Sequence, residues 1–170
     1  MKKELKLSAS LEDYLEVIYD IVRHKQAARA KDIADRLHVR APSVTGALRL
    51  LSEKGLINYA PYDIITMTRD GERIARDVTR RHEALKTFFT KILCVDEQEA
   101  GDIACRLEHE ISPNILKRLK KIVDFIDQCP RAGWQWINEF DSFCRAGKTG
   151  EGCEDCIRDC LAEYHKKKPE

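Results

Sequence analysis

The chain of 170 residues carries a net charge of +1, and 35% of its residues are charged while only 7% are aromatic. This length holds one domain or two small ones, and the composition is typical of a mostly helical, soluble protein. The apolar runs are far shorter than the roughly 20 residues of a membrane span, and the first residues lack a hydrophobic signal region, so we expect a cytoplasmic protein with no membrane partner.

The charge and the cysteines point to two kinds of chemistry. Residues 1–81 contain 16 Lys and Arg against 12 Asp and Glu, whereas residues 82–170 contain 14 against 17. A basic front half suits nucleic-acid contact and an acidic back half suits cation binding, although the imbalance is small. Seven cysteines in a chain without a secretory signal indicate metal or redox chemistry more than structural disulfides.

The first predicted helix begins at a Ser10 cap and runs to about residue 24. Asp13 would be the acid of a capping box, and apolar residues at helical spacing form a stripe facing the core. Asp13 and Glu16 then lie one turn apart beside this stripe. Taken alone, the pair is better explained as a capping acid and a solvated acid than as metal ligands.

A helix-turn-helix follows in residues 31–54. A short helix over 31–38, a turn at 39–41 and a second helix starting at Pro42 and ended by Gly55 have the spacing of this motif. The start of the second helix would enter a major groove. The candidate base or phosphate contacts are Arg40, Pro42, Ser43, Thr45, Gly46 and Arg49.

Two short strands are predicted over residues 56–59 and 64–68, joined by a tip that includes Tyr62. Such a hairpin would be a wing whose tip meets the phosphate backbone. A winged helix can also bind protein alone. The turn, the proline start and the strand pair occur together and in order, which favours DNA binding.

A Thr68 cap predicts a long helix from residue 69 to about residue 93, with His82 midway. If the later stretch 101–111 is also helical, Cys105, Glu108 and His109 share one face and offer sulfur, oxygen and nitrogen ligands to a transition metal. The alternative is a core helix whose cysteine is a small hydrophobe and whose Glu and His face water.

Ser112 and Pro113 predict the start of another helix. Its apolar residues recur at a spacing of four, three and four, which suits either packing within the monomer or a dimer interface. The residues of this seam are Ile115, Leu119, Ile122 and Ile126.

Five segments occur in one order along residues 8–128: SLEDYLEVIYDI, APSVTGAL, NYAPYDIITMTRDG, RRHEAL and ACRLEHEISP. In these the chain resembles the diphtheria toxin repressor and manganese transport regulator family. The resemblance implies a winged helix-turn-helix followed by an all-helical dimerisation domain, and a metal-activated homodimeric repressor that binds a palindromic double-stranded DNA operator. By position, it implies a metal site formed by Asp13, Glu16, His82, Cys105, Glu108 and His109.

The ligand set departs from both branches of that family. The manganese type has a carboxylate where this chain has Cys105, and the iron type has a methionine where this chain has Asp13. A thiolate favours Fe(II), Co(II), Ni(II) or Zn(II), while the carboxylates keep Mn(II) possible; Fe(II) is slightly preferred. Lys86 and Gly101 replace accessory ligands of the iron type, so we expect no accessory site.

The tail is the part that the resemblance explains least. It contains Cys129, Cys144, Cys153, Cys156 and Cys160, which are enough thiols for Zn(II) or an iron–sulfur cluster with one to spare; thiols without metal or disulfides remain alternatives. Cys94 is interpreted as structural. The expected organisation is a DNA-binding domain over 1–78, metal-binding and dimerisation helices over 79–128, and a Cys-rich extension over 129–170.

Other function classes stay open at this point. The tail could make the protein an iron–sulfur or thiol redox-sensing regulator, or a metal or redox carrier. The predicted ligand set could instead be a catalytic metal centre, as in a hydrolase. No glycine-rich phosphate loop or Ser-His-Asp arrangement accompanies it, so we expect a regulator and not an enzyme.

Overall fold

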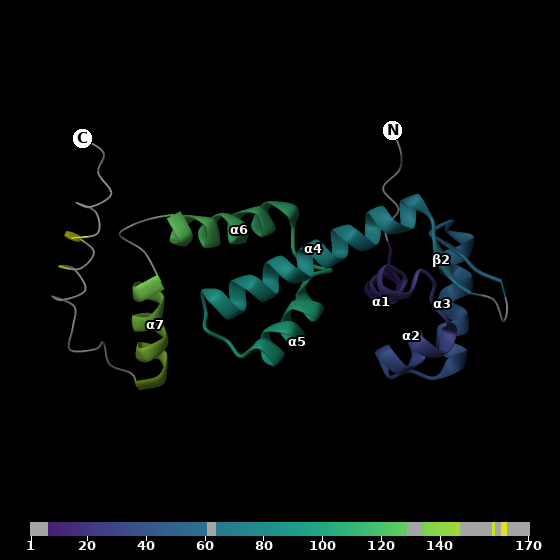
Figure 1. Cartoon of the computed structure of the whole chain (residues 1–170), viewed down its shortest axis with the longest axis horizontal. Helices are drawn as coiled ribbons and strands as arrows, with labels where there is room; N and C mark the ends of the chain where they lie inside the picture. Colours follow the sequence, from purple (N-terminus) through teal and green to yellow (C-terminus); the bar gives the residue numbers. More distant parts are fainter. Residues whose placement is uncertain (1–6, 61–63, 129–133, 147–157, 159–160, 163–170) are drawn as a thin grey trace. The chain divides into compact units, whose positions relative to one another are not determined.

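The computed structural model describes residues 7–60, 64–128, 134–146, 158 and 161–162, and these are mostly helical, as predicted (Figure 1). The chain divides into two compact units, unit 1 over Met1–Arg81 and unit 2 over His82–Glu170. No helix in the described part of the chain is both long and apolar enough to cross a lipid bilayer.

Unit 1 begins with α1 (Ala9–Lys25). Its cap is Ser8, whose extended backbone lets the side chain accept a hydrogen bond from the Leu11 amide at 3.4 Å. The prediction of a Ser10 cap was therefore wrong, because Ser10 already lies in the first turn. Asp13 consequently belongs to the body of the helix and does not complete a capping box.

The helix-turn-helix is confirmed in α2 (Ala30–Leu37) and α3 (Ala41–Glu53). His38 takes the left-handed conformation, with φ 54°, and so ends α2 and turns the chain. Pro42 lies within the first two positions of α3, where its missing N–H costs nothing. Gly55 follows α3 with φ 70°, which a residue with a side chain rarely adopts.

The wing consists of β1 (Ile57–Asn58) and β2 (Thr66–Met67), paired antiparallel with Ile57 opposite Met67. A contact that the sequence did not predict extends it. Ala28, between α1 and α2, exchanges two backbone hydrogen bonds with Ile65, of 2.9 and 2.8 Å. The wing is therefore hydrogen-bonded to the segment between α1 and α2 as well as within its own hairpin.

The core of unit 1 joins all these elements. Large side chains from α1, α2, α3 and the wing are fully buried together. They include Leu15, Ile18, Ile33, Val44, Leu48, Leu51 and Ile65.

A long helix, α4 (Arg69–Lys91), contributes its first part to unit 1 and its remainder to unit 2. The Thr68 hydroxyl accepts a hydrogen bond from the Gly71 amide at 3.1 Å, which confirms the predicted cap. A Cβ atom on Gly71 would lie 1.9 Å from the Leu56 carbonyl oxygen. Only glycine lets the start of α4 approach the end of the helix-turn-helix so closely.

Unit 2 continues with α5 (Glu97–Leu107), α6 (Pro113–Gln128) and α7 (Trp134–Ala146). The Asp96 side chain caps α5, and the Ser112 hydroxyl accepts from the Ile115 amide at 3.3 Å at the start of α6. Among the described residues, Ile92, Val123, Ile126 and Ile137 form a small core.

The apolar seam predicted on α6 is divided between two faces. Val123 and Ile126 are buried, whereas Ile115, Ile122 and Phe125 are 48%, 42% and 58% exposed. One face of α6 therefore packs within unit 2, and a second apolar face is uncovered in the single chain.

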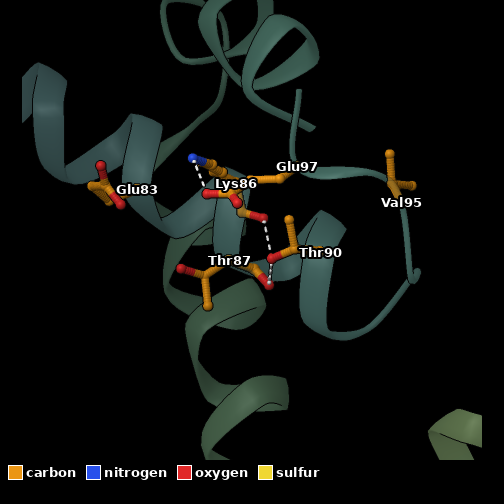
Figure 2. A pocket seen from close by; sticks show the side chains of 6 residues that line it. All are labelled: Glu83, Lys86, Thr87, Thr90, Val95 and Glu97. Carbon is orange, nitrogen blue, oxygen red and sulfur yellow. Dashed lines mark hydrogen bonds and ion pairs between the residues drawn. The ribbon is translucent and has the colours of Figure 1, made fainter. Parts of the chain in front are cut away.

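On the surface of unit 2, α4 is tied to the start of α5 by an ion pair between Lys86 Nζ and Glu97 Oε1 at 2.9 Å (Figure 2). The hydrogen bond that Lys86 donates to Glu97 raises the pKa of Lys86 above its ordinary value. The pair lies in an open pocket of about 390 Å³ that Glu83, Thr87, Thr90 and Val95 also line.

Candidate metal centre and nucleic-acid interface

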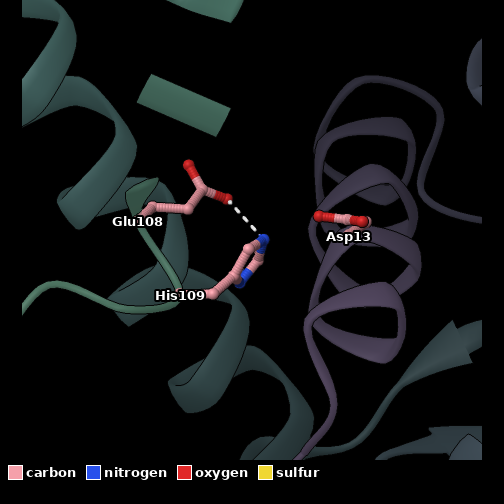
Figure 3. A group of neighbouring side chains, drawn as sticks. All are labelled: Asp13, Glu108 and His109. Atoms are coloured by element: carbon pink, nitrogen blue, oxygen red, sulfur yellow. Dashed lines mark ion pairs between the residues drawn. The ribbon is translucent and has the colours of Figure 1, made fainter. Parts of the chain in front are cut away.

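In unit 2, a fully buried carboxylate lies between two imidazoles. Glu108 Oε2 is 2.7 Å from His82 Nδ1, and Glu108 Oε1 is 3.6 Å from His109 Nε2 (Figure 3 draws the second pair). The side chains of Glu108, His109 and His82 are 0%, 8% and 22% exposed. Burying a carboxylate is costly unless it is paired or binds a cation, so this cluster is a strong candidate for chemistry.

The donor set fits a divalent transition metal. Neutral imidazole nitrogens and a carboxylate oxygen are ligands shared by Mn(II), Fe(II) and Zn(II). A ring nitrogen that contacts a carboxylate also fixes the tautomer and orientation of its histidine. The contacts of Glu108 can therefore orient both imidazoles before an ion arrives.

The geometry around Glu108 corrects one prediction. The helix predicted over 101–111 ends earlier, at Leu107. Glu108 caps it with helical backbone, φ −61° and ψ −26°, and its amide donates to the Ala104 carbonyl. His109 follows in a turn that the Glu110 amide closes onto the Leu107 carbonyl at 3.1 Å. Cys105 is exposed while Glu108 is buried.

In unit 1, the two predicted acidic ligands lie three residues apart on α1, as expected (Figure 3 shows Asp13 on this helix). Asp13 and Glu16 are both partly buried, and the intervening Tyr14 and Leu15 are buried in the core. Core packing therefore fixes the rotation of α1 about its axis and with it the direction of both carboxylates.

Lys86 is one of the two residues because of which we expect no accessory metal site. A protonated amine has no lone pair to offer a metal, and its partner Glu97 is already engaged. The absence of an accessory site at Lys86 stays a prediction.

The face of α3 that is predicted to contact DNA is exposed in unit 1. Val44, Ala47, Leu48 and Leu51 turn into the core, so the opposite face is left for contacts. The predicted contacts Arg40, Pro42, Ser43, Gly46 and Arg49 are exposed. A Cβ on Gly46 would meet nothing within 4 Å, so packing inside the chain does not require glycine there.

Two predicted DNA contacts differ from this group. Thr45 is only partly exposed, and its hydroxyl donates to the Ala41 carbonyl at 3.1 Å. That hydroxyl is therefore engaged with the backbone of its own helix. Tyr62 lies outside the described residues.

The second predicted metal site falls mostly outside the described residues. This applies to Cys129, Cys153, Cys156 and Cys160. Cys144 is described, and it is exposed on α7. Cys94 packs beside the small core of unit 2, and burial raises the pKa of its thiol.

Sequence reasoning missed an ion pair inside unit 1. Arg81 Nη2 on α4 lies 3.3 Å from Glu12 Oε2 on α1, and the two side chains are 17% and 16% exposed. Arg81 was one of several arginines on its helix, and no periodicity singles out Glu12. The available signal was position, because the two residues directly precede Asp13 and His82 in the sequence.

Two family models match the chain. The iron dependent repressor N-terminal DNA binding domain covers residues 6–64, and the iron dependent repressor metal binding and dimerisation domain covers residues 68–136. An uncharacterized HTH-type transcriptional regulator of Methanocaldococcus jannaschii is 36% identical over 115 residues, which are 67% of this chain and 92% of that protein. The regulator MntR of Bacillus subtilis is 33% identical, over 70% of this chain and 83% of MntR.

Solved structures agree with these matches. The metal-dependent transcriptional regulator MtsR is 30% identical, with a TM-score of 0.63, over 74% of this chain and 58% of MtsR. A manganese-dependent transcriptional repressor solved in complex with manganese is 30% identical, with a TM-score of 0.61, over 71% of this chain and 56% of that protein. The chain thus spans little more than half the length of these solved proteins.

Proposed function

Because this chain belongs to the iron-dependent repressor family of metal-dependent, DNA-binding transcriptional repressors, we propose that it represses genes of iron or manganese homeostasis when Fe(II), or alternatively Mn(II), is plentiful. The observation that carries this proposal is the buried Glu108 between His82 and His109. A soluble regulator without a membrane-spanning helix in its described part suits a cytoplasmic location.

The proposed regulatory site comprises Asp13, Glu16, His82, Cys105, Glu108 and His109. Three of these are carboxylates, which repel one another when no cation lies among them. A bound divalent ion would supply the charge that offsets this repulsion. The side chains of α1 would then be held with those of unit 2, and this one arrangement would fix the DNA-reading helices for the operator.

The choice of metal depends on Cys105. If Cys105 binds the ion as a thiolate beside the oxygen and nitrogen donors, it favours Fe(II) over the harder Mn(II). Without the thiolate, carboxylates and imidazoles remain, and these accept Mn(II) readily. Cys105→Glu should therefore shift the preference toward Mn(II).

The family's C-terminal domain is a metal-binding and dimerisation domain. We assign the dimer contact to the uncovered face of α6, which exposes Ile115, Ile122 and Phe125. A twofold dimer presents two α3 helices, so the proposed operator is a palindromic double-stranded DNA site. Residues 1–78 would bind DNA, and residues 79–128 would bind metal and dimerise.

A second function is proposed for the extension over 129–170. Cys129, Cys144, Cys153, Cys156 and Cys160 supply enough thiols for Zn(II) or an iron–sulfur cluster. Visible absorption of anaerobically purified protein separates the two, because only a cluster absorbs there. A cluster would add redox sensing to metal sensing.

A binding titration tests the regulatory proposal. Double-stranded DNA selected from a randomised pool is titrated with anaerobic protein and Fe(II), Mn(II) or EDTA, and fluorescence anisotropy reports binding. We expect tight binding with Fe(II) or Mn(II), its loss in EDTA, and a palindrome in the selected sequences. DNA binding that is indifferent to EDTA contradicts the proposal.

A further inference from the structure

The ion pair between Glu12 and Arg81 differs from the other ion pairs of α4 in unit 1. It joins residues 69 positions apart and is mostly removed from water. The pairs Arg73 with Asp70 and Arg76 with Glu72 lie within α4 itself, and their side chains are 49% to 72% exposed. Exposed pairs within one helix contribute little to stability, whereas a partly buried pair between helices is screened less and fixes geometry.

A second polar contact joins the same two helices inside unit 1. A hydrogen bond with Tyr19 raises the pKa of Arg76 above its ordinary value. Residue 12 meets residue 81, and residue 19 meets residue 76, so α1 contacts the first part of α4 at two points.

The position of the ion pair gives it a consequence for the proposed metal site. Glu12 directly precedes Asp13, and Arg81 directly precedes His82 in the same continuous helix. A side chain anchored at one helical position fixes the rotation of that helix for its neighbours. Together with the core packing of α1, the ion pair thus contributes to the direction of Asp13 from α1 and of His82 from α4.

We infer that Glu12 and Arg81 are positioning residues that preorganise the regulatory metal site; this rests on the proposed function of that site. The pair fixes α1 before an ion arrives, so less binding free energy is spent on ordering it. Neither side chain is required as a ligand. Groups that orient metal ligands typically contribute about 10-fold to 100-fold to metal affinity.

Electrostatics alone predicts the opposite change in metal affinity when Arg81 is neutralised, which makes the inference testable. Arg81→Gln removes a positive charge near a site for a cation, and by Coulomb's law this should tighten metal binding. Loss of positioning should instead weaken it. A paired substitution, Glu12→Gln with Arg81→Gln, removes the ion pair without changing the net charge, and charge alone predicts no effect.

The experiment measures the Kd of the full chain for Mn(II) by equilibrium dialysis, without DNA. We expect Arg81→Gln and the neutral double variant each to raise the Kd by about 10-fold. Arg73→Gln removes the same charge from an exposed pair on the same helix and should change the Kd by less than about twofold. Arg81 also pairs with Asp77 at 3.6 Å, so the charges are exchanged in an Asp77→Asn background, and Glu12→Arg with Arg81→Glu should there restore most of the affinity.

A readout without metal accompanies the dialysis. In EDTA, amides in the first half of α1 should exchange hydrogen faster in Arg81→Gln and in the neutral double variant, because α1 has lost its ion pair with α4. In Arg73→Gln this exchange should stay slow. Either variant suffices if the other does not fold. An unchanged or tighter Mn(II) Kd in the variant that folds overturns the inference. If the unsubstituted chain binds no Mn(II) and no Fe(II), the proposed function fails together with it.

Discussion

Unit 1 and unit 2 bury different kinds of residue. The described core of unit 1 is large and apolar, and it joins α1, α2, α3, the first part of α4 and the wing. The described core of unit 2 is small, while the same unit buries the Glu108 carboxylate completely and exposes apolar side chains on α6. Unit 1 can therefore hold its fold by apolar packing, whereas the proposed cation at Glu108 and the proposed second subunit at α6 would add to the stability of unit 2.

The largest expected effect comes from a substitution that disrupts the apolar core of unit 1. Leu48 on α3 is fully buried, so Leu48→Ala should lower the free energy of unfolding by about 2 to 5 kcal/mol. Leu50, two residues along the same helix, is 47% exposed, and Leu50→Ala should cost less than about 0.5 kcal/mol. Urea denaturation followed by circular dichroism compares them. Equal losses would show that unit 1 does not depend on this core.

The next prediction addresses the buried carboxylate of unit 2. Glu108→Gln keeps the shape but removes the charge, so the affinity for Mn(II) or Fe(II) should fall by about 100-fold or more, beyond the effect typical of outer partners. DNA binding should then no longer respond to metal, while folding in EDTA is nearly intact. Glu110→Gln removes the same charge from an exposed position two residues away and is the matched control. A normal metal response in Glu108→Gln would rule out the proposed site.

The uncovered face of α6 gives a smaller effect. Phe125 is 58% exposed, and Phe125→Ser should weaken the dimer by about 10-fold or more, as expected for an aromatic contact in an interface. Phe143→Ser on α7, where the side chain is 47% exposed, should leave the dimer unchanged. Sedimentation velocity over a concentration series measures both. The reverse result would move the interface from α6 to α7.

Local signals predicted much of the fold. The Thr68 cap, the glycine after α3 and the Ser112-Pro113 start of α6 were each correct, because such signals act through the backbone of their own turn. The helix-turn-helix was predicted for the same reason, since Pro42 and the apolar spacing lie within one short segment. Elements whose ends depend on neighbouring residues can be found without knowledge of tertiary contacts.

Features that depend on distant residues were not predicted. The backbone pairing of Ala28 with Ile65 has no signal in either segment. The predicted helix over 101–111 was too long, because α5 ends at Leu107, where the ladder of backbone hydrogen bonds changes to a turn. The residues of the candidate site were predicted from their positions in the family that the sequence resembles. The burial of Glu108 and its contacts came from the structure alone.

The smallest expected effect concerns two thiols of unit 2, Cys94 after α4 and Cys144 on α7. Burial, and then the charge of Asp141, raises the pKa of Cys94, so a smaller fraction of this thiol is the reactive thiolate at any pH below that pKa. Cys144 is exposed, and iodoacetamide should therefore label Cys144 faster than Cys94, which mass spectrometry of peptides can follow. The rate at Cys94 should keep rising with pH above the ordinary thiol pKa of about 8.5.

Asp141→Asn sharpens this prediction. Without the negative charge the pKa of Cys94 should fall toward its ordinary value, and labelling below that pKa should accelerate. Arg145 lowers the pKa of Cys94, so Arg145→Gln should slow labelling instead. Opposite signs from two substitutions on one helix distinguish an electrostatic effect from a general loosening of α7, which would accelerate labelling in both. Acceleration in both variants would mean that α7 covers Cys94 only weakly and that the small core of unit 2 ends at α6.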